Sequence, residues 1–423
     1  MNQPSPLHLP RLADAPHRLL FFVGAFNVLA MMAWWTSWLA GQRWPALALP
    51  QAPIPAGWAH ALMMPLQVLA PFMFGFLLTV FPRWMNQPEL SRWHYLPVGL
   101  GLFGGQVLML VGLWGFPHLV HLGTVFSIAG WAASMVALFG VLWREQGRTW
   151  HALSAFAALA MGLLAWLLFA AWLHAQANLL WMFAAIKIAV FGFALPVYLT
   201  VCHRMLPFFA SVVIPGYRMW RPLWLLAAWW LLVFAHLLLE LMHGYRLLWI
   251  ADLPMALLAA FTLWQWWPMH RDVRVPQVQD AQERPRKPMP GLLSVLLIGF
   301  SWLPIAFGLF ALQSLVFAIG GEFVLGRGPV HAITIGFFGS LLVAMVTRVT
   351  QGHSGQPLHM TRVAWFAFGV IQCVAVVRVL AEAAADGPLW QIVAGAGWLL
   401  AFTPWVLRSM RIYLSPRADG KPG

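Results

Sequence analysis

Charged side chains are scarce in this chain of 423 residues, because Asp, Glu, Lys and Arg together make up only 9% of it. A typical soluble domain has about 25%. Hydrophobic residues account for 61% of the chain, and the mean hydropathy is +0.75. So much apolar surface cannot be hidden in one soluble core, so most of it must face lipid. The composition therefore predicts an integral membrane protein.

Cysteine is nearly absent, with only Cys202 and Cys373. Two cysteines give neither a disulfide framework nor a zinc knuckle, and no Cys-x-x-Cys-His motif for covalent haem attachment occurs. The sequence also lacks a phosphate-binding loop, a nucleophile elbow and a paired-carboxylate motif, which argues against ATP-driven and hydrolytic functions. The first sixteen residues are polar and proline-rich, so no cleavable signal peptide is expected.

Long apolar runs, separated by Arg, Pro and Gly, predict an all-α polytopic bundle of about twelve transmembrane helices in one membrane domain over residues 1–423. The expected spans are 17–40, 57–82, 94–115, 117–143, 151–173, 178–203, 221–243, 248–268, 291–318, 329–350, 362–383 and 388–410. The polar stretch 269–290 is expected to be a cytoplasmic linker. No internal repeat is evident by inspection, which disfavours repeat-built transporter architectures.

The positions of the basic residues predict the orientation of the chain. The formal charge of +13 would suggest a nucleic-acid partner for a soluble protein, but here the lipid bilayer is the expected partner. With the N-terminus inside, 20 of the 25 Lys and Arg residues fall in cytoplasmic segments, and the outer loops hold only Arg43, Arg246 and Arg327. Since basic loops stay on the cytoplasmic side, both termini are expected in the cytoplasm.

Histidine is the abundant metal-capable residue, with 15 copies. In the expected topology, seven lie on the outer face: His60, His118, His121, His174, His236, His243 and His331. A single histidine at a span end usually bonds headgroups or water. Seven from five spans instead predict a metal or cofactor site, because neutral imidazole binds Fe, Cu and Zn and helix bundles build such sites from facing helices. His118 and His121 are three residues apart and can chelate one ion.

His331 and His353 stand at opposite ends of one expected span. They are 22 residues apart, which is about 33 Å in a helix, so they cannot share a metal. His331 is expected to be a ligand in the outer set. His353 lies in a Gly-His-Ser-Gly turn, where it either joins a second, inner metal site with His203 or His17, or simply orders that turn.

Four charged side chains lie inside expected spans, where such groups are costly and are functional candidates. They are Lys187, Glu240, Arg378 and Glu382. A buried cation beside a haem can pair with the propionates, so Lys187 and Arg378 are candidate cofactor-binding residues. The alternative, which we weigh equally, is that Lys187–Glu240 and Arg378–Glu382 are structural ion pairs.

Several stretches resemble the NnrS family, haem- and copper-containing bacterial membrane proteins associated with nitric oxide stress and denitrification. The most specific are His331-Ala-Ile-Thr-Ile-Gly336 and Met345-Val-Thr-Arg348-Val-Thr-Gln-Gly-His353-Ser-Gly-Gln-Pro-Leu358. They are similar to the family's His-Ala-Leu-Thr-Val-Gly and Met-Thr-Arg-Val-Ser-Leu-Gly-His-Thr-Gly-Arg-Pro-Leu. The segments 75–84 and 204–209 also resemble family segments, so the similarity covers nearly the whole chain.

The early signature departs from the family pattern. Where the family has Trp-His-Ala-His-Glu-Met, this chain has Trp58-Ala-His60-Ala-Leu62-Met63. His60 carries over, but a site that needs both histidines lacks one ligand. Methionine can bind haem iron or Cu(I), so either Met63 or Met64 substitutes, or this chain has lost or relocated a metal.

The resemblance implies a non-covalent, b-type haem held by His60 and His331, with copper as a second candidate metal and nitric oxide as the small-molecule ligand. It also implies a bacterial cytoplasmic membrane. Whether the protein catalyses a reaction or only binds nitric oxide stays open. The alternative function is a twelve-span transporter of a metal ion or small metabolite, with buried His, Lys, Arg and Glu lining its pathway. A third interpretation is a membrane sensor or maturation factor.

Overall fold

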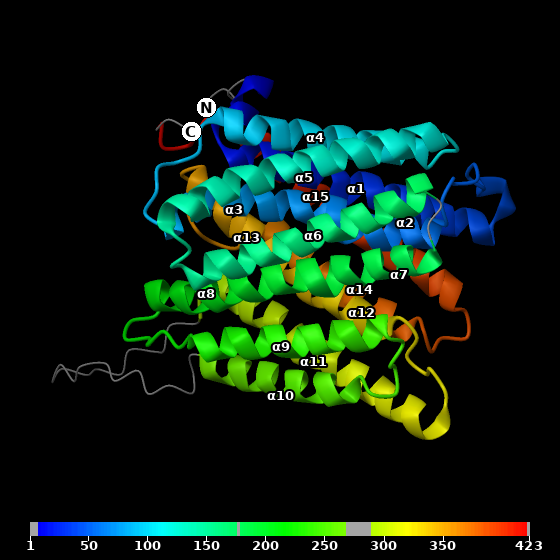
Figure 1. The fold of residues 1–423 in the computed structure, drawn as a ribbon. Helices are drawn as coiled ribbons and strands as arrows, with labels where there is room; N and C mark the ends of the chain where they lie inside the picture. Colours follow the sequence, from blue (N-terminus) through cyan, green and yellow to red (C-terminus); the bar gives the residue numbers. More distant parts are fainter. Residues whose placement is uncertain (1–6, 176–177, 268–288, 421–423) are drawn as a thin grey trace.

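The structure is a computed structural model that describes residues 7–175, 178–267 and 289–420. Within these ranges it is helical, with no strand, which confirms the predicted all-α class. Figure 1 shows long helices running side by side, with the N- and C-termini at the same end of the bundle. We call this the termini end and the opposite one the far end. The expected linker 269–290 lies almost entirely outside the described residues.

The bounds of the helices follow the apolar runs of the sequence. In chain order they are η1 (Leu9–Asp14), α1 (Pro16–Arg43), η2 (Pro45–Leu47), α2 (Ala56–Met63), η3 (Met64–Leu69), α3 (Ala70–Trp84), α4 (Arg92–Gly112), α5 (Pro117–Glu145), α6 (Trp150–Ala175), α7 (Leu179–Lys187), η4 (Ile188–Ala194), α8 (Leu195–Val213), α9 (Leu223–Leu241), α10 (Trp249–Trp266), α11 (Gly291–Gly320), α12 (Gly328–His331), η6 (Ala332–Gly339), α13 (Ser340–His353), α14 (Arg362–Leu380) and α15 (Gly387–Leu414). The helix α8 extends ten residues beyond the expected end of its span, because it continues through Pro207.

Eleven helices in the described ranges are long and apolar enough to cross a membrane. The helix α10 is not among them, because polar residues such as Asp252 and Gln265 lower the mean hydropathy of its 18 residues. It nevertheless packs lengthwise against α9 and α11. Large apolar side chains on the outside of the bundle, such as Val136 and Leu231, are 73% and 70% exposed. Exposing such side chains to water costs about 1.5–3 kcal/mol each, so this surface suits lipid.

Three spans form the centre of the bundle, and each contains a π-helical segment. They are α2–η3–α3, α7–η4–α8 and α12–η6–α13, in which η3, η4 and η6 are the π segments. In these spans 89%, 67% and 72% of the most apolar window is buried, against 56% or less in the other candidate spans of the described ranges. Since π segments are rare and are frequently found at functional sites, these three spans are where a site is expected.

The packing of the helices repeats every four spans. Each central span packs against the long helix that precedes it, which is α1, α6 or α11. The next two helices pair with each other, as α4 with α5, α9 with α10, and α14 with α15. Contacts of α5 with α6, α10 with α11, and α15 with α1 then close a ring around the central spans. This repeat was not evident in the sequence, because buried and lipid-facing positions accept many apolar side chains of similar volume.

Two arginines link the central spans near the termini end. The Arg204 guanidinium of α8 lies 4.7 Å from the ring centroid of Trp84, the last residue of α3. The Arg348 guanidinium of α13 lies 3.8 Å from the ring centroid of Phe209 in α8. Each such cation–π contact contributes about 0.5–2 kcal/mol. The second, sixth and tenth expected spans are therefore tied to one another in sequence order.

Candidate functional site

His60 and His331 lie on different central spans at the far end. His60 is on α2, one turn before η3, and His331 is the last residue of α12, directly before η6. The imidazole of His331 is close enough to His60 to interact with it electrostatically, and both rings lie within the influence of the Arg378 guanidinium. The structure therefore brings three of the four predicted cofactor-binding residues into one region.

The hydrogen bond of His331 fixes which of its ring nitrogens carries the proton. Its Nδ1 lies 2.8 Å from the backbone carbonyl oxygen of Arg327. A carbonyl can only accept, so Nδ1–H donates and Nε2 keeps its lone pair. Metal-bound histidines typically donate their other N–H in this way. His331 is thus held in the tautomer that offers Nε2 to a metal.

His60 is oriented by an aromatic neighbour on α1. Its ring stacks on Trp35, with ring centroids 4.4 Å apart and planes 10° from parallel. The Nδ1 atom is buried and has no hydrogen-bond partner among the described residues. An unsatisfied buried polar atom costs about 1–3 kcal/mol, and such an atom in a native protein calls for an explanation such as a bound ligand.

Arg378 of α14 forms one of the two buried ion pairs predicted from the sequence. Its Nη1 lies 2.5 Å from Glu382 Oε1, and the two side chains are only 10% and 17% exposed. The loop before α12 passes close to this carboxylate at Gly326, where a side chain would collide with Glu382. A guanidinium has five N–H donors, so Arg378 can bind an anion while it keeps its bond to Glu382.

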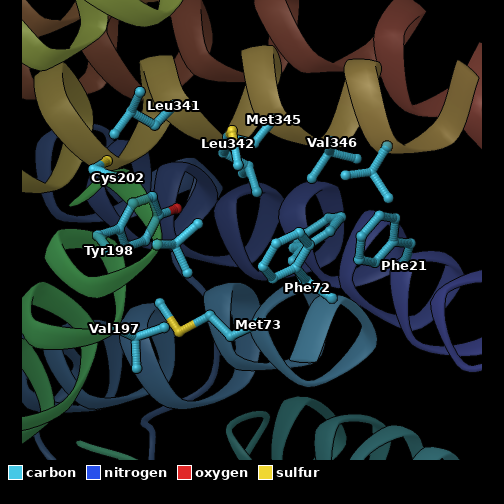
Figure 2. A pocket seen from close by; sticks show the side chains of 13 residues that line it. Phe21, Phe72, Met73, Val197, Tyr198, Cys202, Leu341, Leu342, Met345 and Val346 are labelled. Atoms are coloured by element: carbon cyan, nitrogen blue, oxygen red, sulfur yellow. The ribbon is translucent and has the colours of Figure 1, made fainter. Parts of the chain in front are cut away.

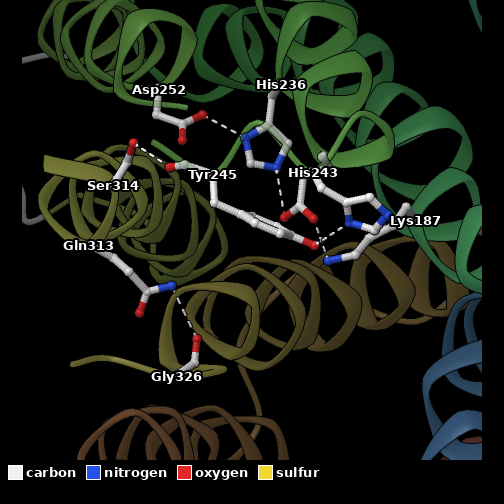
Figure 3. A network of polar contacts seen from close by, with 9 residues as sticks. Lys187, His236, His243, Tyr245, Asp252, Gln313, Ser314 and Gly326 are labelled. Carbon is white, nitrogen blue, oxygen red and sulfur yellow. Dashed lines mark hydrogen bonds and ion pairs between the residues drawn. The ribbon is translucent and has the colours of Figure 1, made fainter. Parts of the chain in front are cut away.

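Lys187 forms the second ion pair. It is the last residue before η4, just as His331 is the last residue before η6. Its Nζ lies 2.6 Å from Glu240 Oε2 of α9, so its partner is on the neighbouring helix. The structure therefore shows Lys187 in the ion pair that the sequence analysis gave as the alternative. The polar network around this pair, drawn in Figure 3, does not include His60 or His331.

In the structure, a third histidine, His174, lies next to the predicted chelating pair His118 and His121. His121 Nδ1 on α5 lies 2.8 Å from His174 Nδ1 on α6, at the far end, and His118 is within the electrostatic influence of His121. His118 and His174 are exposed. No group of three or more His, Cys, Asp or Glu side chains with metal-binding geometry occurs in the described part of the chain. This cluster is therefore a two-histidine pair with a neighbour.

His353 lies at the termini end and meets His17 of α1. Their ring centroids are 4.4 Å apart, with planes at 38°. The other partner expected from the sequence, His203, instead lies 2.8 Å from His151 Nε2 through its Nδ1, and 3.0 Å from the Pro222 carbonyl oxygen through its Nε2. The sequence did not reveal the His151–His203 pair, because it depends on how α6 and α8 are rotated toward each other.

An apolar cavity lies between the three central spans and α1 (Figure 2). Its lining includes Phe72 and Met73 of α3, Tyr198 and Cys202 of α8, and Leu341 and Leu342 of α13. Phe21 of α1 also lines it and touches the His17 ring edge-on, with centroids 6.2 Å apart. Apolar cavities bind small uncharged molecules.

A comparison with known protein families identifies the chain. The family model described as "NnrS protein" matches residues 11–417. The chain belongs to the NnrS family. No curated protein matches it.

The residues that mark the NnrS family have different places in the structure. His331 and Arg348 lie on one central span, His331 at the far end and Arg348 against Phe209. Leu62 and Met63, which replace the histidine and glutamate of the NnrS pattern, are both fully buried. Met64 is the first residue of the π segment η3.

Proposed function

We propose that this NnrS-family protein is a haem-binding protein of the bacterial cytoplasmic membrane that handles nitric oxide. The observation that carries the proposal is that His60 and His331, from two central spans, lie at the far end within electrostatic range of each other and of Arg378. The hydrogen bond from His331 to the Arg327 carbonyl supports it, because it leaves Nε2 available to iron.

The residues present fit a haem. His60 and His331 would hold the iron, and Arg378 would pair with a propionate through N–H groups that Glu382 does not use. The orphaned Nδ1 of His60 fits a site that a bound group completes. Bound there, a haem supplies an iron centre that takes diatomic ligands such as nitric oxide. The apolar cavity between the central spans also suits that uncharged gas, although His60, His331 and Arg378 do not line it.

Two further elements belong to the proposal. The twelve-span count includes α10, which packs lengthwise between α9 and α11, and the basic loops of the sequence put the termini end in the cytoplasm. Copper is proposed as the second metal, and the His121–His174 pair with His118 is the place that its chemistry favours.

An optical spectrum and metal analysis of the protein, purified after expression with ample haem, test the proposal. We expect a Soret band and bound iron, both of which are lost in His331→Ala. The matched control is His94→Ala, since His94 is exposed and bonds only Ser91 in the described structure. Absence of a Soret band and of bound iron and copper would refute the proposal, and substrate-dependent uptake into vesicles without haem would favour the transporter alternative.

A further inference from the structure

Four ionisable side chains follow one another from α7 through α9 to α10, and the proposed haem site does not use them. Lys187 Nζ is 2.6 Å from Glu240 Oε2, and Glu240 Oε1 is 3.7 Å from His236 Nε2. His236 Nδ1 is in turn 2.6 Å from Asp252 Oδ1. Figure 3 shows His236 between Asp252 on one side and the Lys187 end of the network on the other.

The inner part of this chain is shielded from water. The side chains of His236 and Asp252 are 0% exposed and that of Glu240 is 4% exposed. Phe191 and Phe310 pack on the His236 ring, with centroids 4.2 and 4.9 Å away. Ionisable groups at such a place in a membrane protein are expensive and typically serve ion or proton pathways.

The net charge of the four side chains depends on one proton that two of them can carry. Two carboxylates stand against one ammonium, so the network is neutral only when it holds one more proton, on His236 or on Asp252. His236 Nε2, Asp252 Oδ2 and Glu240 Oε2 are buried and have no hydrogen-bond partner in the described ranges, and the contact of Lys187 with Glu240 Oε2 is an ion pair. Because the imidazole turns one nitrogen toward each carboxylate, a proton can bind at one nitrogen while another leaves from the other.

The Lys187 end of the chain is partly exposed, and the far-end connection that follows α9 lies near it. The Lys187 side chain is 25% exposed, and the exposed His243 ring packs on Phe183, 4.8 Å between centroids. Tyr245 OH lies 3.3 Å from His243 Nδ1. Burial, reinforced by the charge of Glu240, raises the pKa of Tyr245, so its hydroxyl stays neutral. From α11, Figure 3 draws two neutral side chains: Ser314, which donates to the Tyr245 carbonyl oxygen, and Gln313, which donates to the Gly326 carbonyl oxygen, apart from the relay.

We propose that Lys187, Glu240, His236 and Asp252 form a proton relay that loads and unloads Asp252 from the aqueous phase at the far end. In loading, Lys187 Nζ–H gives a proton to Glu240 and regains one from water. Glu240 O–H then protonates His236 Nε2 while the Nδ1–H proton passes to Asp252 Oδ1. No electron moves, and the net change is one proton carried from water to Asp252.

This relay deepens the proposed function, and its role rests on that function. A charge that arrives on a haem buried in a low dielectric is stabilised by a compensating charge, which a proton on Asp252 would supply.

Infrared spectroscopy of the haem-free full-length protein tests the relay itself. We expect a carboxylic-acid carbonyl band that shifts when water is replaced by D2O and that is lost in Asp252→Asn. In Lys187→Met the band should remain and its exchange should slow at least about 100-fold, the low end of what a positioned proton-transfer group contributes.

Asp386→Asn is the matched control, because it makes the same chemical change at an exposed carboxylate of the far end, 39% exposed. It should leave both the band and its exchange unchanged. Glu240→Gln, which keeps the size of the side chain, should slow exchange like Lys187→Met, with a melting temperature measured alongside to show that the variant is folded. A band that survives in Asp252→Asn, or wild-type exchange in folded Lys187→Met and Glu240→Gln, would overturn the relay. Loss of haem binding with an intact relay would refute the haem proposal alone.

Discussion

The Arg348 guanidinium lies 3.8 Å from the centroid of the Phe209 ring, so the tenth expected span is fastened to the sixth near the termini end. Replacing Arg348 by Ala should lower the free energy of unfolding by about 1 kcal/mol. Lys should restore only part of this, because an ammonium does not stack as the planar guanidinium does. Thermal unfolding in detergent measures both variants. Arg408→Ala, which changes an exposed arginine of α15, is the control. An equal loss of unfolding free energy there would show that the contact of Arg348 with Phe209 does not stabilise the protein.

The stacking of Trp35 on His60 should matter for haem retention. Trp35→Leu removes the ring that holds the imidazole in its orientation, and an aromatic contact of this kind contributes about 0.5–1.5 kcal/mol. We therefore expect haem to bind up to about tenfold more weakly, as measured by the Soret absorbance on dilution. Trp38→Leu is the control, because Trp38 stacks on Trp35 but, among the described residues, does not stack on His60. Equal losses in the two variants would contradict a role in orienting His60.

The Arg378–Glu382 pair should show different effects in single and double variants. Arg378→Met leaves Glu382 buried without its partner, which costs about 3–5 kcal/mol of stability for a buried pair. The double variant Arg378→Met/Glu382→Leu should recover most of that loss, since no charge is then left unpaired. It should not recover haem affinity if Arg378 also holds a propionate. Unfolding and haem titration on the same samples separate these effects, and full haem affinity in the folded double variant would remove Arg378 from the site.

The His121–His174 pair should affect copper but not haem. His174→Ala takes away one of the two nitrogens that lie 2.8 Å apart, so bound copper should fall while the Soret band is unchanged. His8→Ala, an exposed histidine at the termini end, serves as the comparison. Copper content of the purified variants decides the matter, and unchanged copper in His174→Ala would place that metal elsewhere.

The sequence predicted the helical class and the gathering of His60, His331 and Arg378 at one end, because both follow from the lengths of apolar runs and their alternating direction. It did not predict partners that depend on helix rotation. Asp252 meets His236 only because α10 turns its first turn toward α9, and no spacing in the sequence contains that information. The π segments were also missed, since they depend on packing in the centre of the bundle and not on any one residue type.

The first and last long helices are neighbours, and the backbone N–H of His8 donates to the carbonyl oxygen of Leu414 over 3.1 Å. The ring of helices is therefore closed, and the chain could start at another connection at the termini end without changing the ring. A circularly permuted chain, with its old ends joined and new ones opened in the connection 146–149 between α5 and α6, at the same end of the bundle, would keep every helix beside its present neighbours. Chain ends that lie close together at a surface tolerate such rewiring, and the order in which the three groups of four helices are synthesised would change while their arrangement stayed the same.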